Sequence, residues 1–310
     1  MDVSIIIVSY NTRELLADCL RSIHAQTLDT SFEILVVDNN STDGSADYVR
    51  EHFPRVVLIA SAENLGFAGA NNLAAARAQG EYLFLLNPDT VILDRAIDRL
   101  IAFARGRPQA RIWGARTVFA DGSLNPTCCY NQTTLWSLFC RALGLTVLFR
   151  STDLFNPEGF GNWRYDSPRQ VDIITGCCLL IPRAFWEELR GFDLHFHMYG
   201  EEVDLCTRAR SLGARPWFTP EATIVHYGGA SEASKGIRMV KVFKAKVALM
   251  KKHWPRWKRW VGVRLLMAWS LSRFLCGYVC QRLGGKPVRS LDMWIHVWRN
   301  RRLWVHGYDP

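Results

Sequence analysis

The chain has 310 residues, about half of them apolar, and a formal net charge of +9 at pH 7. This size suits one large domain with an appendage, or two domains. The nine cysteines are odd in number and show no C-x-x-C spacing, which argues against a cysteine metal site, and we expect reduced thiols in a cytoplasmic protein. The apolar run at residues 5–8 is too short for the core of a cleavable signal peptide.

The first 110 residues alternate between strand and helix patterns. Apolar, β-branched runs predict strands at residues 3–9, 33–37, 56–60 and 82–86. Helical spacing and capping residues predict helices at residues 12–26, 45–52, 67–79 and 94–105. Gly80 is expected to end the third helix. This alternation predicts an α/β fold with a parallel sheet, whose ligands bind beyond the carboxyl ends of the strands.

The pattern is weaker between residues 112 and 168, where Gly, Asn and Pro turns are frequent. We interpret this stretch as an insertion that faces the ligand cleft. A strand interrupted at Thr175-Gly176 is then expected over residues 171–181, followed by a helix at 183–190. Residues 214–218 and 223–226 are predicted to form two short strands.

Polar residues stand where several of these strands end. Asp38 and Asn39 follow the second strand and can hydrogen-bond a base or a ribose; a turn with a helix cap is the alternative. The turn after the first strand, which begins at Ser9, lacks the G-x-G-x-x-G pattern of a dinucleotide site.

Two further strand ends suggest contact with a diphosphate. Asp89, in the turn Asn87-Pro88-Asp89, can hold a hard divalent cation, although such a turn usually has no further role. His226 precedes a double glycine, whose backbone amides can approach a phosphate. A lone histidine is, however, more often structural than a ligand.

The most concentrated charge lies at Glu201, Glu202 and Asp204. On a helix, Glu201 and Asp204 share one face, whereas Glu202 points to a neighbouring one. Like charges this close repel each other. In a cleft, one carboxylate can be a general base while another fixes its position or the substrate. The alternative is a solvated first turn, which the helix dipole favours.

The C-terminal part of the chain differs in composition from the rest. Residues 235–310 carry 18 basic and two acidic residues, a net charge of +16, against −7 for the remainder. Seven of the twelve tryptophans also lie there. Residues 235–254 predict a basic amphipathic helix. Three arginines interrupt the apolar stretch 260–283, which argues against a membrane span. We expect helices in the interface of an anionic membrane; packing on the catalytic domain or on a partner subunit is the alternative.

Seven segments occur in the order typical of glycosyltransferase family 2, and the set most resembles its bacterial rhamnosyltransferase branch. They are residues 5–11, 37–45, 63–71, 86–90, 175–177, 191–208 and 226–231. The resemblance implies the GT-A fold with a mixed, mainly parallel sheet. It also implies a nucleotide-sugar donor, Mg²⁺ or Mn²⁺, and inversion at the anomeric carbon by a single displacement.

The resemblance also implies a division of the chain. Residues 1–235 would form the catalytic domain, with a nucleotide-binding half at about 1–110 and an acceptor-binding half at 111–235. Residues 236–310 would form a helical membrane-associating region.

The resemblance assigns roles residue by residue. The residues at nucleotide-binding positions are Ser9, Tyr10, Asn11, Asp38, Asn39, Asn64 and Gly66. The residues that would face the acceptor are Thr175, Gly176, Met198 and Tyr199. Asp89 matches the last residue of the metal-binding D-x-D, whose first member is here Asn87. His226 matches a further metal or diphosphate contact of some relatives. Glu201-Glu202 matches the family's Glu-Asp pair, which makes Glu202 the expected base and Asp204 the second choice.

The function implied by the resemblance is that of a cytoplasmic, metal-dependent, inverting glycosyltransferase in bacterial surface-polysaccharide assembly. It would be peripheral on the inner face of the plasma membrane. The expected donor is dTDP-L-rhamnose and the expected acceptor is a polyprenyl-diphosphate-linked saccharide; a UDP- or GDP-sugar is the alternative donor. No nucleic-acid partner is expected, and a homo-oligomer is compatible with the sequence.

Two other classes of protein stay open as alternatives. A nucleotidyltransferase is disfavoured because no Gly-rich phosphate loop follows the first strand. The second alternative is a non-catalytic protein that binds a nucleotide sugar or serves as a scaffold. Asn87 supports it, because an asparagine in place of the first aspartate of D-x-D leaves the metal site with one anionic ligand fewer.

Overall fold

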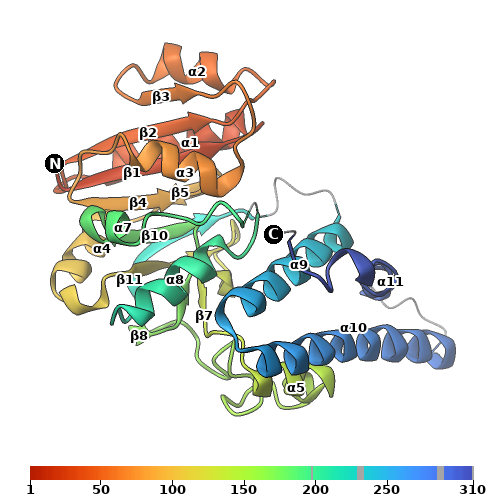
Figure 1. Ribbon diagram of the computed structural model, residues 1–310. Helices are drawn as coiled ribbons and strands as arrows, with labels where there is room; N and C mark the ends of the chain where they lie inside the picture. Colours follow the sequence, from red (N-terminus) through yellow and green to blue (C-terminus); the bar gives the residue numbers. More distant parts are fainter. Residues whose placement is uncertain (197, 229–233, 285–289, 309–310) are drawn as a thin grey trace. The chain divides into compact units, whose positions relative to one another are not determined.

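The computed structural model describes residues 1–196, 198–228, 234–284 and 290–308, which form two compact units (Figure 1). The first unit takes the described residues of Met1–Tyr130, Arg164–His197 and Glu201–Ser231. The second takes those of Asn131–Trp163, Met198–Gly200 and Glu232–Pro310. Residues 131–163 thus group with the C-terminal helices. The assignment of a catalytic domain to residues 1–235 stays a prediction.

A nine-stranded sheet runs through the first unit. Its strands, in order, are β3 (Val57–Ala60), β2 (Phe32–Asp38), β1 (Val3–Ser9), β4 (Tyr82–Leu86), β10 (Cys178–Pro182), β6 (Trp113–Val118), β11 (Trp217–His226) and β5 (Thr90–Ile92), with β8 (Arg169–Gln170) paired to β11. β10, β5 and β8 run opposite to the other strands. The predicted mixed, mainly parallel sheet is confirmed.

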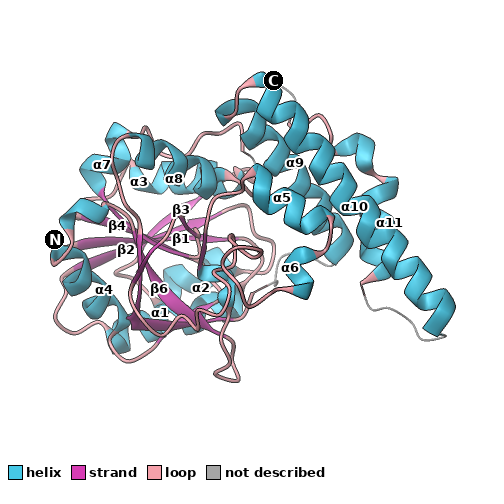
Figure 2. Ribbon diagram, turned by 90° about the horizontal axis from the view of Figure 1, so that it is seen from below, coloured by secondary structure: helices cyan, strands magenta, loops and turns pink. Residues whose placement is uncertain are grey.

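Helices cover both faces of this sheet (Figure 2). One face carries α3 (Gly66–Ala75), α7 (Arg183–Glu188) and α8 (Glu201–Ser211); the other carries α1 (Arg13–Gln26) and α4 (Ala96–Arg105), with α2 (Ser45–His52) beside α1. A strand covered on both faces has a continuous apolar run rather than an alternating one. All of β4 and residues 3–7 of β1 are buried. Each fully buried Ile or Leu there contributes about 1.5–3 kcal/mol.

The third helix ends earlier than predicted, which changes the role of Gly80. α3 stops at Ala75, so Gly80 does not terminate it. A Cβ on Gly80 would lie 2.5 Å from the backbone nitrogen of Ser4 in β1. Gly80 is therefore required by a close approach of two backbone segments.

The interpretation of residues 112–168 as an insertion is wrong for their first part. β6 lies inside the sheet, between β10 and β11. At Gly114 in this strand, a Cβ would lie 2.6 Å from Cγ2 of Ile174, so the neighbouring chain fills the space of a side chain. A short strand, β7 (Cys129–Tyr130), pairs with β9 (Ile173–Ile174).

The two strands predicted at residues 214–218 and 223–226 also need correction. They form one strand, β11, whose pairing with β6 shifts register between Thr219 and Thr223. The irregularity at this point includes Pro220, which cannot donate a ladder hydrogen bond. The break in the apolar pattern therefore marks a bulge within a strand rather than its end.

The second unit is helical, in agreement with the prediction of a C-terminal helical appendage. Its helices are α5 (Leu135–Ala142), α6 (Leu145–Leu148), α9 (Lys235–His253), α10 (Arg256–Gly284) and α11 (Leu291–Arg299). Phe243 lies at the centre of its core, with its ring centroid 5.0 Å from those of Trp269 and Trp304. Trp294 is also buried. This corrects the expectation of headgroup contacts for these three tryptophans, which form the core instead.

Among the described residues, one helix is long and apolar enough to cross a membrane by length and composition alone. This is α10 over Arg256–Leu283, which contains an 18-residue segment with a mean hydropathy of 1.2. The share of that segment buried inside the protein is 22%. Core helices of water-soluble proteins meet the same criteria of length and composition.

A buried cluster of charges joins residues 131–163 to α9. Glu158 Oε2 lies 3.2 Å from Arg141 Nη2 and 3.6 Å from Lys246 Nζ. Lys246 also donates to Thr133 Oγ1 at 2.7 Å. Burial would raise the pKa of Glu158, but the charges of Lys246 and Arg141 outweigh it and lower the pKa to about 2. Breaking this cluster would leave buried charges without partners.

The helical unit should therefore lose stability in acid. A carboxyl whose pKa is lower in the folded than in the unfolded protein stabilises the folded state. Its contribution is complete at pH values above the unfolded pKa and is lost as the pH falls through the folded pKa. For Glu158, whose pKa falls from 4.5 to about 2 on folding, this contribution to the free energy of unfolding is on the order of 3 kcal/mol. We expect the destabilisation caused by Glu158→Gln, measured by urea unfolding, to shrink between about pH 6 and pH 3.

Glu187→Gln is the control for this measurement. The side chain of Glu187 is 59% exposed in an ion pair with Arg183, so the substitution should change the free energy of unfolding by less than about 0.5 kcal/mol at every pH. A pH-independent effect of Glu158→Gln would contradict the role given to this cluster.

Candidate active site

Most of the polar residues identified in the sequence lie at one edge of the sheet in the first unit. β1 to β4 are parallel, so their carboxyl ends meet there. β11 ends at the same edge, where His226 stands opposite Thr90. β10 runs the other way and begins there, with Cys178 opposite Leu86. Residues from distant parts of the chain are thereby brought together.

Asn39 organises the end of β2. Its backbone N–H donates to the carbonyl of Ser9 at 2.8 Å, and its side-chain oxygen accepts from the N–H of Leu65 at 2.8 Å. Its amide nitrogen donates to Asn64 Oδ1 at 3.0 Å, and the N–H of Gly66 donates to the same oxygen at 2.9 Å. The predicted residues Asn39, Asn64 and Gly66 thus form one network that joins β1, β2 and the start of α3.

Asp38 stands beside this network with one unpaired oxygen. The residue is 4% exposed. Its Oδ2 accepts from the N–H of Ser41 at 3.2 Å, whereas Oδ1 has no hydrogen-bond partner among the described residues. A buried acceptor without a partner costs about 1–3 kcal/mol. A ligand that donates an N–H or O–H here, such as a base or a ribose, would remove that cost.

The turn after β1 carries the remaining predicted nucleotide residues. Ser9 Oγ lies 2.9 Å from Thr12 Oγ1. Asn11 has a φ of 53° and accepts a hydrogen bond from the N–H of Thr42 at 2.8 Å. Tyr10 is 47% exposed, so its ring is accessible for stacking on a base. The turn is held by hydrogen bonds to the loop after β2 on one side and presents an aromatic ring on the other.

Asp89 and His226 form a polar pair at the end of β11. His226 Nε2 lies 3.4 Å from Asp89 Oδ1 and 3.3 Å from Asn87 Nδ2. Asp89 Oδ2 accepts from the N–H of Gly228 at 3.0 Å. Burial lowers the pKa of His226, but Asp89 and the thiol of Cys177 outweigh it and raise the pKa to about 10. Against the effect of burial, His226 in turn lowers the pKa of Asp89.

A divalent cation fits this pair only together with other ligands. No group of three His, Cys, Asp or Glu side chains suited to a metal occurs in the described part of the chain. The carboxylate of Asp89 is nevertheless a ligand of the kind that Mg²⁺ and Mn²⁺ accept, and His226 could add a nitrogen ligand only in its neutral form. Mg²⁺ sites commonly combine one or two carboxylates with substrate phosphates and water. The second half of the predicted phosphate loop, residues 229–231, lies outside the described residues.

Two neighbouring glutamates at the start of α8 have opposite environments. Glu201 is 6% exposed, and its Oε2 has no hydrogen-bond partner among the described residues. Burial first, and the charge of Glu202 second, raise the pKa of Glu201 well above its usual range. Glu202 is half-buried, and its Oε1 accepts from the hydroxyl of Tyr130 at 3.2 Å. A buried carboxyl with a raised pKa therefore stands next to one that accepts a hydrogen bond, and acid–base catalysis uses such a difference in environment.

Asp204, the third carboxylate of the cluster, is held in an ion pair. It is fully buried, and Arg208 Nε donates to its Oδ2 at 2.7 Å. The same guanidinium donates to the carbonyls of Leu189, at 2.5 Å, and Gly191, at 2.8 Å. Asp204 thus anchors α8 to the loop after α7. This position suits a structural role better than that of a base.

Thr175 and Gly176 lie in the short connection between β9 and β10. The N–H and the hydroxyl of Thr175 both donate to the carbonyl of Cys128 at 3.1 Å. A Cβ on Gly176 would lie 2.8 Å from the ring of Phe67 in α3. A glycine is therefore required here because the chain passes directly against an aromatic ring.

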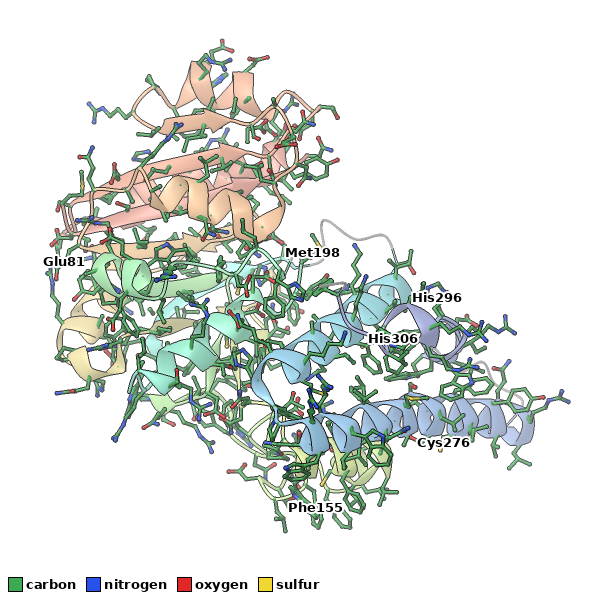
Figure 3. All side chains as sticks on the ribbon, viewed as in Figure 1. Glu81, Phe155, Met198, Cys276, His296 and His306 are labelled. Carbon is green, nitrogen blue, oxygen red and sulfur yellow. The ribbon has the colours of Figure 1, made fainter. Side chains whose placement is uncertain are left out.

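The other two predicted acceptor residues, Met198 and Tyr199, belong to the second unit. The hydroxyl of Tyr308 donates to the carbonyl of Met198 at 2.5 Å (Met198 is labelled in Figure 3). Tyr199 and Gly200 both have positive φ, of 66° and 99°, so the loop turns sharply before α8. The acceptor role of these two residues stays a prediction.

Sequence reasoning missed two residues of the site. Tyr130, which holds Glu202, lies in the stretch with the weakest pattern, and its two-residue strand is too short for a period to be recognised. Cys177 lies in the segment that was already singled out at Thr175-Gly176, but only the structure shows its effect on His226.

Comparisons with known proteins agree with this arrangement. The family described as Glycosyl transferase family 2 matches residues 4–188. The O-antigen biosynthesis protein RfbC of Myxococcus xanthus is 29% identical over 76% of this chain, which spans only 18% of that protein. An N-acetylglucosaminyl-diphospho-decaprenol L-rhamnosyltransferase of Mycobacterium tuberculosis is 27% identical over 72% of this chain and 75% of its own.

Two solved structures share the fold. The mannosyltransferase PcManGT of Pyrobaculum calidifontis, in complex with GDP-Man and Mn²⁺, has a TM-score of 0.58 at 16% identity, over 97% of this chain and 85% of its own. GalNAc-T7 with UDP, GalNAc and Mn²⁺ has a TM-score of 0.60 at 16% identity, over 86% of this chain and 51% of its own. The expected GT-A fold is thereby confirmed.

The hydroxyl of Tyr130 should matter for turnover and not for nucleotide binding. In Tyr130→Phe, Glu202 loses the hydrogen bond that orients it. We expect about tenfold slower turnover, since a hydrogen bond to a charged group contributes about 1.5–3 kcal/mol. Steady-state kinetics and nucleotide titration measure the two properties separately.

Tyr165→Phe is the matched control for this variant. Tyr165 is buried in the same unit, and its hydroxyl donates to the carbonyl of Pro126 at 3.3 Å. Turnover that falls equally in both variants would show that the loss reflects general destabilisation.

Proposed function

The chain belongs to glycosyltransferase family 2, and on that basis we propose that it is a metal-dependent, inverting rhamnosyltransferase. It would move L-rhamnose from dTDP-L-rhamnose to a polyprenyl-diphosphate-linked saccharide. The observation that carries the proposal is the hydrogen bond from Tyr130 to the carboxylate of Glu202, beside the buried Glu201. Support for the donor sugar and for a lipid-linked acceptor comes from the name of the Mycobacterium relative. A UDP- or GDP-sugar is the alternative donor.

The nucleotide would bind along the ends of β1 and β2. Oδ1 of Asp38 is a buried acceptor that needs a donor, and an N–H of the base or a hydroxyl of the ribose supplies one. The network around Asn39 already holds the surrounding loops by hydrogen bonds. Little ordering is then left for the moment of binding, which favours affinity. The exposed ring of Tyr10 offers a stacking surface for the base.

The departing diphosphate would lie toward Asp89 and His226. Asp89 would hold Mg²⁺ or Mn²⁺, with Asn87 beside it. His226 could join as a ligand only after it loses the proton that its raised pKa favours. When bound, the metal supplies positive charge that stabilises the leaving diphosphate. The N–H of Gly228 donates to Asp89 and fixes the orientation of its carboxylate.

Glu202 would act as the general base. Its carboxylate takes the proton of the acceptor hydroxyl while the hydroxyl oxygen bonds to the anomeric carbon and the bond from that carbon to the diphosphate breaks. Asp204 is a weaker candidate because Arg208 already engages it. Glu201 is neutral and buried, and therefore a poor nucleophile. A single usable carboxylate favours one displacement with inversion, as in the geometry of inverting glycosidases.

The second unit suggests where the reaction takes place. Residues 235–310 carry a net charge of +16, and Trp257 and Trp260 are 65% and 61% exposed. Basic residues attract anionic lipids, and tryptophan favours the headgroup region. We therefore propose peripheral association with the cytoplasmic face of the plasma membrane, where a lipid-linked acceptor for surface polysaccharide would be reached.

Thermal stabilisation by nucleotide sugars tests the donor assignment. A ligand that binds only the native state raises the melting temperature. We expect dTDP-L-rhamnose with Mn²⁺ to stabilise the purified protein most, and Asp89→Asn to reduce the part of the shift that depends on Mn²⁺. Stabilisation by UDP- or GDP-sugars alone would keep the transferase class and reject rhamnose. If no nucleotide sugar stabilised the protein, a scaffold function would replace the enzymatic one.

Three substitutions in α8 separate the roles of its carboxylates. Glu202→Gln should lower turnover about 10²–10⁴-fold, the usual contribution of a general base, while nucleotide binding is retained. Glu201→Gln replaces a neutral group with a neutral one of the same shape and should stay within about threefold of wild type. Asp204→Asn should mainly destabilise the protein, by on the order of 3 kcal/mol. Near-normal turnover of Glu202→Gln, measured by release of the nucleoside diphosphate, would reject Glu202 as the base.

A further inference from the structure

A pocket with basic walls lies between α9 and α10 in the second unit. It has a volume of about 390 Å³ and is lined by Lys251 of α9 and by Arg256, Arg259, Trp260 and Arg264 of α10, with three valines completing the wall. No acidic side chain lines it. Four positive charges around one small volume repel each other, so the pocket is electrostatically suited to an anion.

The charged groups of this pocket are available to a ligand. The side chains of Lys251, Arg256 and Arg259 form no ion pair or hydrogen bond with other described residues. Arg264 stacks over the ring of Trp260 at 4.5 Å, which leaves its N–H groups free to donate at the ring edge. By contrast, the buried Arg141 and Lys246 of the same unit share the carboxylate of Glu158. In this pocket several cations thus meet without a counter-charge from the described residues.

The geometry of α10 adds to the preference for an anion. Arg256 and Arg259 lie in the first turn of this 29-residue helix. The first backbone N–H groups of a helix have no partner within the helix, and the helix dipole favours negative charge there. Arginine side chains can bind a phosphate through two parallel hydrogen bonds. Phosphate is therefore the chemical group that suits these residues best.

An exposed stripe of α10 continues from this pocket. At 3.6 residues per turn its members all fall on one side of the helix. The exposed residues of the stripe are Trp257, Trp260, Arg264, Ala268, Leu275, Tyr278 and Val279. The opposite side of the helix, with Leu266, Trp269 and Ser270, is buried in the core of the unit. Only 22% of an 18-residue apolar segment of α10 is buried. The helix thus exposes tryptophans beside the pocket and apolar residues further along.

We propose that this pocket binds the phosphate of an anionic phospholipid headgroup while the stripe of α10 lies on the acyl-chain side of the interface. The inference rests on the proposed membrane association and names the site that carries it. A free phosphate would explain the basic pocket but not the adjoining tryptophans and apolar residues. A phospholipid explains both, because its headgroup is anionic and its neighbourhood is apolar.

Flotation of the full chain with lipid vesicles tests this site. Wild type should bind phosphatidylcholine vesicles that contain phosphatidylglycerol and bind pure phosphatidylcholine weakly. Arg256→Gln with Arg259→Gln should weaken binding to the anionic vesicles about 30-fold, since each basic residue at a membrane contributes about 1 kcal/mol. The melting temperature should not change, because these side chains make no contact that the fold needs.

The control removes the same charge elsewhere in the unit. Arg299 and Arg302 are exposed and lie outside the pocket, so Arg299→Gln with Arg302→Gln should weaken binding by less than about threefold. Equal losses in the two double variants would overturn the pocket and leave only a diffuse attraction to the membrane. Equal binding of wild type to both kinds of vesicle would overturn it as well.

A separate thermal-stability experiment distinguishes a lipid from a soluble phosphate as the ligand. Inorganic phosphate without vesicles should not raise the melting temperature of wild type. If it does, and if Arg256→Gln with Arg259→Gln abolishes that shift but leaves vesicle binding intact, the pocket binds free phosphate and the lipid assignment is wrong. None of these measurements uses a nucleotide sugar, so their failure is distinguishable from failure of the proposed transferase function.

Discussion

The candidate active site depends on one ion pair within α8, between Arg208 and Asp204. The guanidinium of Arg208 satisfies a fully buried carboxylate and two carbonyls of the loop after α7 at the same time. This holds α8 in place less than one turn from Glu201 and Glu202. Three carboxylates in four residues can coexist because each has a different environment. Asp204 is paired, burial raises the pKa of Glu201, and Glu202 accepts a hydrogen bond from Tyr130.

Polar groups at the ends of the strands also differ in whether they have hydrogen-bond partners. Side-chain amides, above all that of Asn39, satisfy the loop backbones, and this leaves oxygen atoms such as Oδ1 of Asp38 without a partner. An unpaired buried acceptor destabilises the protein without ligand, and a ligand that pairs with it recovers that free energy. The first unit therefore combines rigid surroundings with a small number of unsatisfied atoms, which is the condition for selective binding.

Much of this architecture could be predicted from the sequence, for identifiable reasons. β1, β2 and β4 are covered on both faces, so their apolar runs are continuous and easy to recognise. β6 was missed because Gly114 is packed by Ile174 of another segment, which no local pattern records. Tyr130 was missed because its role depends on a partner 72 residues away. The sequence shows that residues 235–310 are basic and rich in tryptophan. Composition alone cannot tell that Trp269 and Trp304 are buried while Trp257 is exposed.

The hydrogen bond from Tyr308 to the carbonyl of Met198 links the end of the chain to the residues that lead into α8. Residues 198–200 belong to the helical unit, and the next peptide bond enters the helix that carries Glu201 and Glu202. The backbone that leads into Glu201 is therefore held by a residue 110 positions further along the chain, so the start of α8 depends on a contact that its own sequence does not contain.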